Sequence, residues 1–159
     1  MATLGKVVEQ SDLILSILPP AAAIGQAEHV AAEMKKQGKH PIYVDCNAIS
    51  PETAKKVAVV IEGAGAQFID AGIIGLAPGK GTGPRFYVSG PDVGAMLDLD
   101  GKGFQVIRSG ENVGEASTLK MVYAGLTKGT WTLQTAVLLA AQKLGVIDTL
   151  LEELEFSQS

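Results

Sequence analysis

The chain has 159 residues, of which 47% are hydrophobic and 19% are charged, a composition that supports a folded domain rather than a disordered segment. Its net charge of −4 argues against a general nucleic-acid binder, which needs a basic face for phosphates. No stretch reaches the roughly 18 uncharged apolar residues of a membrane span, no signal-peptide pattern opens the sequence, and a single cysteine excludes an internal disulfide. We therefore expect a cytoplasmic protein, or one in an organelle matrix, with neither nucleic-acid nor membrane partners.

Short apolar runs alternate with helical segments over the first 111 residues. The run that begins at Asp12 stops at Pro19 and Pro20, as a strand buried on both faces would. An Ala-rich segment that ends at Gly38 predicts a helix, and Ser50 before a proline predicts the N-cap of the next one. The pattern predicts strands at 12–18, 42–46, 67–71, 85–89 and 104–108, helices at 21–37, 51–62 and 91–99, and a glycine-rich loop at 72–83. Such alternation implies βαβ units and a mainly parallel sheet.

The pattern changes after Gly110. Apolar residues recur at helical spacing over residues 113–144 without a proline, which predicts one long helix. Gly125 and Gly129 leave one stripe of this helix without side chains, which favours close approach by a neighbouring element. A short helix at 147–156 follows. We therefore divide the chain into a sheet domain at 1–111 and, at 112–159, a long helix with the start of a helical domain.

Three segments fall at the carboxyl ends of predicted strands, where open α/β sheets bind their ligands. The turn at Leu18, Pro19 and Pro20 is rigid and could lie flat against a nicotinamide or an adenosine, or could simply end the strand. Asn47 follows the second strand and offers both amide donors and an acceptor. Backbone amides around 72–75 could bind a carboxylate. No metal site is expected, because neither histidine has ligand partners at suitable spacing.

Lys120 lies on the long predicted helix. An ammonium on the inward side of a helix loses hydration, and its pKa can fall into the range where it exchanges protons. Tyr123 and Thr127 share its helical face. Lys120 is thus a candidate acid/base residue, and the alternative is a surface lysine that extends its amine into solvent.

Four segments, taken in order, resemble the β-hydroxyacid dehydrogenase family, which includes the 3-hydroxyisobutyrate and 6-phosphogluconate dehydrogenases. Ser11–Pro19 is similar to the strand that ends in a Leu-Pro turn beside the cofactor, and Val44–Pro51 is similar to the D-x-S-[ST]-I-x-P segment. Phe68–Gly75 is similar to the F-x-D-A-P-V-S-G substrate loop, and Val113–Lys120 is similar to the G-x-G-x-x-x-K signature.

The resemblance implies an oxidoreductase that passes hydride between NAD or NADP and a small hydroxy acid, with Lys120 as the catalytic lysine. It places the cofactor against Leu18, Pro19, Pro20, Asn47 and Ala48, and the substrate against Asn47, Ile74, Gly75 and Lys120. The fold implied is a partial Rossmann-like parallel sheet, followed by a long interdomain helix and the start of an all-α domain. We expect a homodimer formed through the helical region.

The sequence departs from the family at several positions. Ala124 occupies the place of an asparagine that assists the lysine, so Tyr123 or Thr127 is expected to take its part. Ile74 stands where a serine is expected, and Ala48 stands where a serine or threonine is common. The family's glycine-rich first βαβ unit is absent before residue 1. The competing hypothesis is therefore a non-catalytic fragment or pseudoenzyme that serves as a dimerisation or interaction module.

Overall fold

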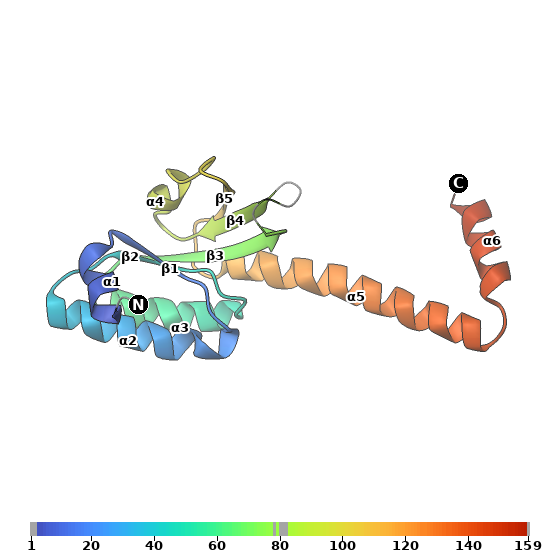
Figure 1. The fold of residues 1–159 in the computed structure, drawn as a ribbon, viewed down its shortest axis with the longest axis horizontal. Coiled ribbons are helices and arrows are strands. Elements are labelled where there is room, and N and C mark those ends of the chain that lie inside the picture. Colours follow the sequence, from blue (N-terminus) through green and yellow to red (C-terminus); the bar gives the residue numbers. More distant parts are fainter. Residues whose placement is uncertain (1–2, 78, 80–82, 159) are drawn as a thin grey trace. The chain divides into compact units, whose positions relative to one another are not determined.

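The structure is a computed structural model that describes residues 3–77, 79 and 83–158. It consists of two compact units, Met1–Met121 and Val122–Ser159. The first unit contains a sheet with helices on both faces (Figure 1), and the second contains only helical segments. The boundary between the two units lies inside a helix, ten residues beyond the domain boundary predicted at residue 111. The predicted domain division stays a prediction.

The sheet of the first unit has five strands in the order β1-β2-β3-β4-β5. The strands are β1 (Leu13–Ser16), β2 (Ile42–Asp45), β3 (Phe68–Gly75), β4 (Pro84–Ser89) and β5 (Gln105–Gly110). Neighbouring strands run parallel except β3 and β4, which pair antiparallel from Asp70↔Ser89 to Gly75↔Pro84. The predicted α/β fold with a mainly parallel sheet is confirmed.

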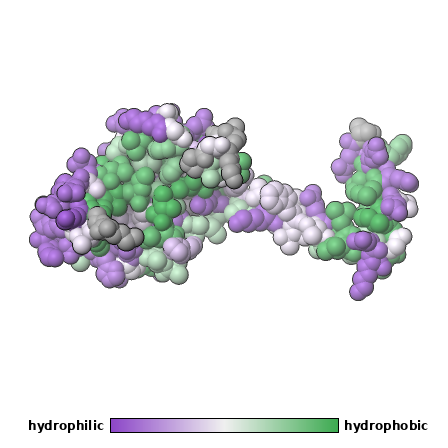
Figure 2. Space-filling view, in the orientation of Figure 1, coloured by the Kyte–Doolittle hydropathy of each residue, from purple (hydrophilic) through white to green (hydrophobic). Residues whose placement is uncertain are grey.

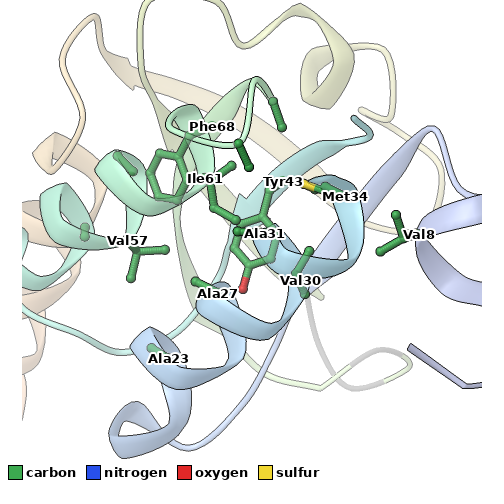
Figure 3. Packing of buried hydrophobic residues seen from close by; sticks show 14 of the residues in the cluster. Val8, Ala23, Ala27, Val30, Ala31, Met34, Tyr43, Val57, Ile61 and Phe68 are labelled. Atoms are coloured by element: carbon green, nitrogen blue, oxygen red, sulfur yellow. The ribbon is translucent and has the colours of Figure 1, made fainter. Parts of the chain in front are cut away.

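One face of this sheet packs against α1 (Leu4–Gln10), α2 (Ala23–Gln37) and α3 (Pro51–Glu62). Tyr43 of β2 and Phe68 of β3 lie in this core with their ring centroids 6.3 Å apart, and aliphatic side chains of the helices surround them (Figure 3). The next residues along the same strands, Val44 and Ile69, lie in a second core with α4 (Gly94–Leu97). Because side chains alternate across a strand, neighbouring residues of β2 and β3 fill the cores on the two faces of the sheet.

Local sequence signals explain how several helices begin and end. The Ser50 Oγ accepts a hydrogen bond from the Thr53 N–H at 3.2 Å, which confirms the predicted N-cap of α3. Gly38 has a φ of 66° at the end of α2, and its N–H donates to the Met34 carbonyl, which confirms the predicted C-cap. A 3-10 turn (Pro20–Ala22) leads from the end of β1 into α2.

The structure differs from the prediction in two places. The helix α1 was not predicted; it begins at the N-cap Thr3 and buries Val8. The predicted glycine-rich loop is wrong in its first part, because residues 72–75 continue β3 and pair with β4. Of the rest of that loop, residues 78 and 80–82 lie outside the described residues.

The long helix α5 (Glu115–Lys143) starts in the first unit and continues into the second, where α6 (Ile147–Ser157) follows it. Its bounds agree with the predicted helix at 113–144. Many apolar residues of the second unit are exposed, among them Leu126, Trp131, Leu133, Leu139, Leu144 and Phe156. Figure 2 shows hydrophobic residues beside hydrophilic ones on the visible face of this unit. Among the described residues, no helix is both long and apolar enough to cross a membrane.

Candidate functional site

Asn47 joins the carboxyl ends of β1 and β2. Its Oδ1 accepts a hydrogen bond from the Leu18 N–H at 2.5 Å, while its Nδ2 donates to the Ser16 hydroxyl at 3.3 Å and to the Asp45 carboxylate at 3.1 Å. The residue is only 3% exposed. Asn47 thus lies at the predicted strand end, but its amide is used inside the protein, and a direct contact with a ligand stays a prediction.

The other predicted cofactor contacts are exposed at the same edge of the sheet. Leu18, Pro19 and Pro20 form the turn after β1, and Ala48 follows Asn47. The Leu18 amide is held by Asn47, and the prolines restrict the backbone around it. The edge therefore presents a rigid, mostly apolar surface to solvent.

Two titratable side chains are buried beside Asn47. Burial raises the pKa of the Asp45 carboxyl, the hydrogen bonds from Asn47 oppose this, and the charge of Asp70 adds to it. Burial also raises the pKa of the Cys46 thiol to about 12, reinforced by the charge of Asp45 and opposed by that of Lys120. The Lys120 charge therefore acts on the carboxyl end of β2.

Lys120 packs against β3. A Cβ built on Gly72 would lie 3.1 Å from the Lys120 Cβ, 3.5 Å from its Cδ and 3.0 Å from the Ala116 carbonyl oxygen. Lys120 itself is partly buried. Its aliphatic stem thus packs on the sheet at a glycine, and the stem lies on the sheet side of α5.

The start of α5 is bound to the sheet by two buried polar side chains. The Asp70 carboxylate accepts hydrogen bonds from the Gly114 and Ser117 N–H groups, at 3.0 and 2.9 Å, and from the Ser117 hydroxyl at 2.6 Å. The Ser89 hydroxyl donates to Asp70 and accepts from the Ala116 N–H at 2.9 Å. The first turn of the helix therefore has a fixed place at the edge of the sheet.

The two predicted substrate residues in β3 differ in exposure. Ile74 pairs with Arg85, and its side chain is buried. Gly75 is exposed, has a φ of 119°, and approaches the Gly83 carbonyl so closely that a Cβ would lie 2.8 Å from the oxygen. Only glycine fits at position 75.

An apolar pocket lies next to Gly75. Its volume is about 300 Å³, and it combines residues from the end of β1, from β3 and β4, and from the segment before β5. The lining consists of Ile17, Ile73, Gly75, Leu76, Ala77, Pro84, Phe86 and Phe104. The pocket suits an apolar group or the face of a planar ring.

Residues 1–96 match the family described as the NAD binding domain of 6-phosphogluconate dehydrogenase, which is more than half of the chain. The chain belongs to this family. The resemblance inferred from the sequence is thereby confirmed, and the predicted nicotinamide cofactor agrees with the NAD-binding description of the family.

Relatives of this NAD-binding family match most of the chain. An uncharacterized 28.5 kDa protein in the 7S RNA 5' region of Methanothermus fervidus is 36% identical over 151 residues, which is 94% of this chain and 55% of the relative. The mitochondrial 3-hydroxyisobutyrate dehydrogenase of Drosophila melanogaster is 31% identical over 109 residues, 64% of this chain and 33% of the enzyme. The solved structure of a conserved protein of unknown function, described as structurally similar to 3-hydroxyacid dehydrogenases, matches with a TM-score of 0.78 and 32% sequence identity. The match covers 99% of this chain and 58% of the solved chain. The chain thus spans between 33% and 58% of the length of these three relatives.

The NAD-binding family match covers the strand-end residues of β1 to β3 but ends before Lys120. Tyr123 and Thr127 lie further along α5, in the second unit. Tyr123 is 46% exposed, and the Thr127 hydroxyl donates to the Tyr123 carbonyl at 2.8 Å. The catalytic roles of Tyr123 and Thr127 stay predictions. Among residues 3–77, 79 and 83–158, no group of three or more His, Cys, Asp and Glu side chains could hold a metal ion.

The sequence analysis gave no role to the side chains of Asp70, Ser89 and Ser117, although the structure gathers them around the start of α5. One signal for Asp70 was available, since a charged residue in the apolar run Phe68–Ala71 must be paired or hydrogen-bonded if it is buried. Its partners were not predictable from spacing, because they lie 19 to 47 residues away.

Proposed function

We propose that this chain forms part of an NAD(P)-dependent dehydrogenase in which Lys120 is the acid/base residue. The supporting observation is the place of Lys120, whose stem packs on Gly72 and whose charge acts on Cys46 at the end of β2. Ligands of open α/β sheets bind at this end of the strands. The substrate would be a small hydroxy acid, and the cytoplasm is the expected site of the reaction.

The residues at this edge fit one part of a dinucleotide. The exposed turn Leu18–Pro20, the exposed Ala48 and the apolar pocket beside Gly75 suit the flat nicotinamide ring. A pyrophosphate needs a glycine-rich turn at a helix N-terminus, and the described residues contain none that follows a strand. In this proposal Asn47 acts by holding Leu18, and the remaining part of the cofactor is bound by the first βαβ unit of a full-length family member.

The reaction would separate hydride and proton transfer. A bound nicotinamide would supply the acceptor for the hydride that leaves the alcohol carbon of the substrate. Lys120, as the neutral amine, takes the hydroxyl proton, so that the C–O bond becomes a carbonyl, and it returns a proton in the reverse direction. A positioned acid/base residue contributes about 10²–10⁴-fold to a rate. Backbone groups at Ile74 and Gly75 would hold the substrate carboxylate, and Tyr123 or Thr127 would replace the missing asparagine.

The second candidate function is a dimerisation or interaction module without catalysis. It is favoured by the exposed apolar residues of the second unit, such as Leu126, Trp131 and Phe156, because contiguous exposed apolar surface usually marks an interface. In both candidate functions we propose a homodimer through α5 and α6. The domain division at residues 111 and 112 is part of the same proposal.

The first experiment joins this chain to the parts of its Methanothermus relative that the chain does not match, and it screens small hydroxy acids with NAD and NADP. We expect turnover that falls at least about 100-fold in Lys120→Ala and is unchanged in Lys128→Ala, whose lysine is exposed on the same helix. Full turnover by Lys120→Ala would exclude Lys120 as the acid/base residue. Heat of binding in a calorimetric titration of the chain alone with NADH or NADPH would favour the dehydrogenase over the interaction module.

A further inference from the structure

Asp70 is a buried carboxylate that takes no part in the proposed proton and hydride transfers. It is 1% exposed and accepts four hydrogen bonds. Three of them come from the first turn of α5, from residues 44 and 47 positions along the chain. A buried carboxylate is tolerated only when donors replace its lost hydration, and here the donors are mainly those of one helix.

Ser89 extends this contact to a second strand. Its hydroxyl donates to Asp70 at 3.2 Å and accepts from the Ala116 N–H at 2.9 Å. The N–H groups of a first helical turn have no partner within the helix. At the start of α5, the amides of Ala116, Ser117 and the preceding Gly114 donate to side chains of β3 and β4. The sheet therefore fixes where this helix starts, and the negative charge of Asp70 lies at the positive end of the helix dipole.

Lys120 lies one turn beyond these contacts, on the same face of the sheet. Asp70 and Gly72 are two residues apart in β3 and so point to the same side, and the Lys120 stem packs directly on Gly72. We infer that Asp70, together with Ser89, is a positioning residue that sets where the Lys120 amine lies relative to the strand ends. This inference rests on the proposed function of Lys120.

The test weakens the contact without changing any charge, since removal of the Asp70 charge would act on every nearby amine. The variant Ser89→Ala with Ser117→Ala loses the two hydroxyls that donate to Asp70, and the Ser89 hydroxyl is also the acceptor of the Ala116 N–H. Thr118→Ala is the matched control, because this residue is in the same turn, is exposed, and bonds to the Gly114 carbonyl at 2.7 Å. Each purified full chain is acetylated with a trace of acetic anhydride from pH 7 to pH 11. Peptide mass spectrometry then gives the rate for Lys120 relative to Lys128.

We expect the pH profile of Lys120 acetylation to move by about half a pH unit in the double variant, which is about a threefold change in the acetylation rate at a given pH. The profile should not move in Thr118→Ala. The positioning role would be falsified if hydrogen exchange shows that the first turn of α5 has loosened in the double variant while the Lys120 profile has not moved. An equal shift in Thr118→Ala would falsify it as well. If circular dichroism shows that the double variant does not fold, the single variant Ser117→Ala carries the same comparison.

The outcome is separable from that of the proposed function. Full turnover by Lys120→Ala in the joined dehydrogenase would remove the catalytic part of Lys120, and the acetylation profiles would still report whether Asp70 and Ser89 set its place. Conversely, an unmoved profile together with a catalytic Lys120 would reject the positioning role alone.

Discussion

Replacing Asn47 by alanine tests whether this amide is a structural link or a free ligand contact. The substitution removes the acceptor of the Leu18 N–H and the donor to Ser16 and Asp45. A neutral hydrogen bond contributes about 0.5–1.5 kcal/mol and one to a charged group about 1.5–3 kcal/mol. The Ser16 contact is long at 3.3 Å and contributes least. We therefore expect Asn47→Ala to lower the free energy of unfolding by about 2–4 kcal/mol in the absence of any ligand.

The measurement is urea unfolding followed by circular dichroism, together with hydrogen exchange of peptides from β1 and β2. Fluorescence of Trp131 is unsuitable because this residue belongs to the second unit. Asn112→Ala is the control: this asparagine is exposed and its Nδ2 donates only to the Glu115 carboxylate at 3.0 Å among the described contacts. It should cost less than about 0.5 kcal/mol, as surface substitutions do.

A loss below about 1 kcal/mol in Asn47→Ala would refute the reasoning, because the strand-end hydrogen bonds would then add little to the fold. In that case the Asn47 amide would be available to a cofactor or substrate, as the sequence suggested. Faster hydrogen exchange restricted to the ends of β1 and β2 would instead identify the link as local and structural.

Two further predictions concern buried positions of the first unit. Burial raises the pKa of the Asp45 carboxyl, so the unfolded chain loses this proton first as the pH rises above about 4. The free energy of unfolding then falls by up to about 1.4 kcal/mol per pH unit until Asp45 ionises in the native state. Urea unfolding from pH 4 to pH 7 should show this fall in the native sequence and not in Asp45→Asn, and parallel profiles of the two proteins would contradict the prediction. In Gly72→Ala the new methyl meets Lys120 and the Ala116 carbonyl at 3.0–3.1 Å, and we expect a loss of about 1–3 kcal/mol. The control Gly25→Ala has no atom within 4 Å of its new methyl and should gain about 0.5–1 kcal/mol as a helix-interior alanine; equal effects of the two alanines would exclude the close approach of α5 to β3.

The strands and most helices were predictable because their signals are local. Buried strands of a parallel sheet give continuous apolar runs, and capping residues such as Ser50 and Gly38 act within a few positions of the helix they end. The helix α1 was missed because seven residues give too little periodicity, and its stability depends on burying Val8. Residues 72–75 read as a loop from their glycines, but pairing with β4 holds them in a strand.

The places of the candidate residues in the fold were more predictable than their contacts, and their roles stay predictions. Leu18 and Asn47 were expected at the carboxyl ends of strands and Lys120 on the inward side of a helix; the structure has Asn47 against Leu18 and Lys120 against Gly72. The sequence does not show how a polar side chain uses its donors. The Asn47 amide could have faced a ligand or the neighbouring strand, and only the geometry shows that it bonds to Ser16 and Asp45.

The contact between β3 and α5 also explains why a lysine at position 120 suits this sheet. Asp70 binds Ser117, and Gly72 contacts Ala116 and Lys120. Two residues of a strand span about 6.6 Å, and three residues of a helix span about 4.5 Å, so the step from Asp70 to Gly72 is comparable to the step from Ser117 to Lys120. The hydrogen bonds of Asp70 and the absence of a side chain at Gly72, at this spacing, hold the first turn of α5 along β3. A lysine at position 119 or 121 would be turned about 100° away from the glycine, and its amine would leave the edge where β1, β2 and β3 end.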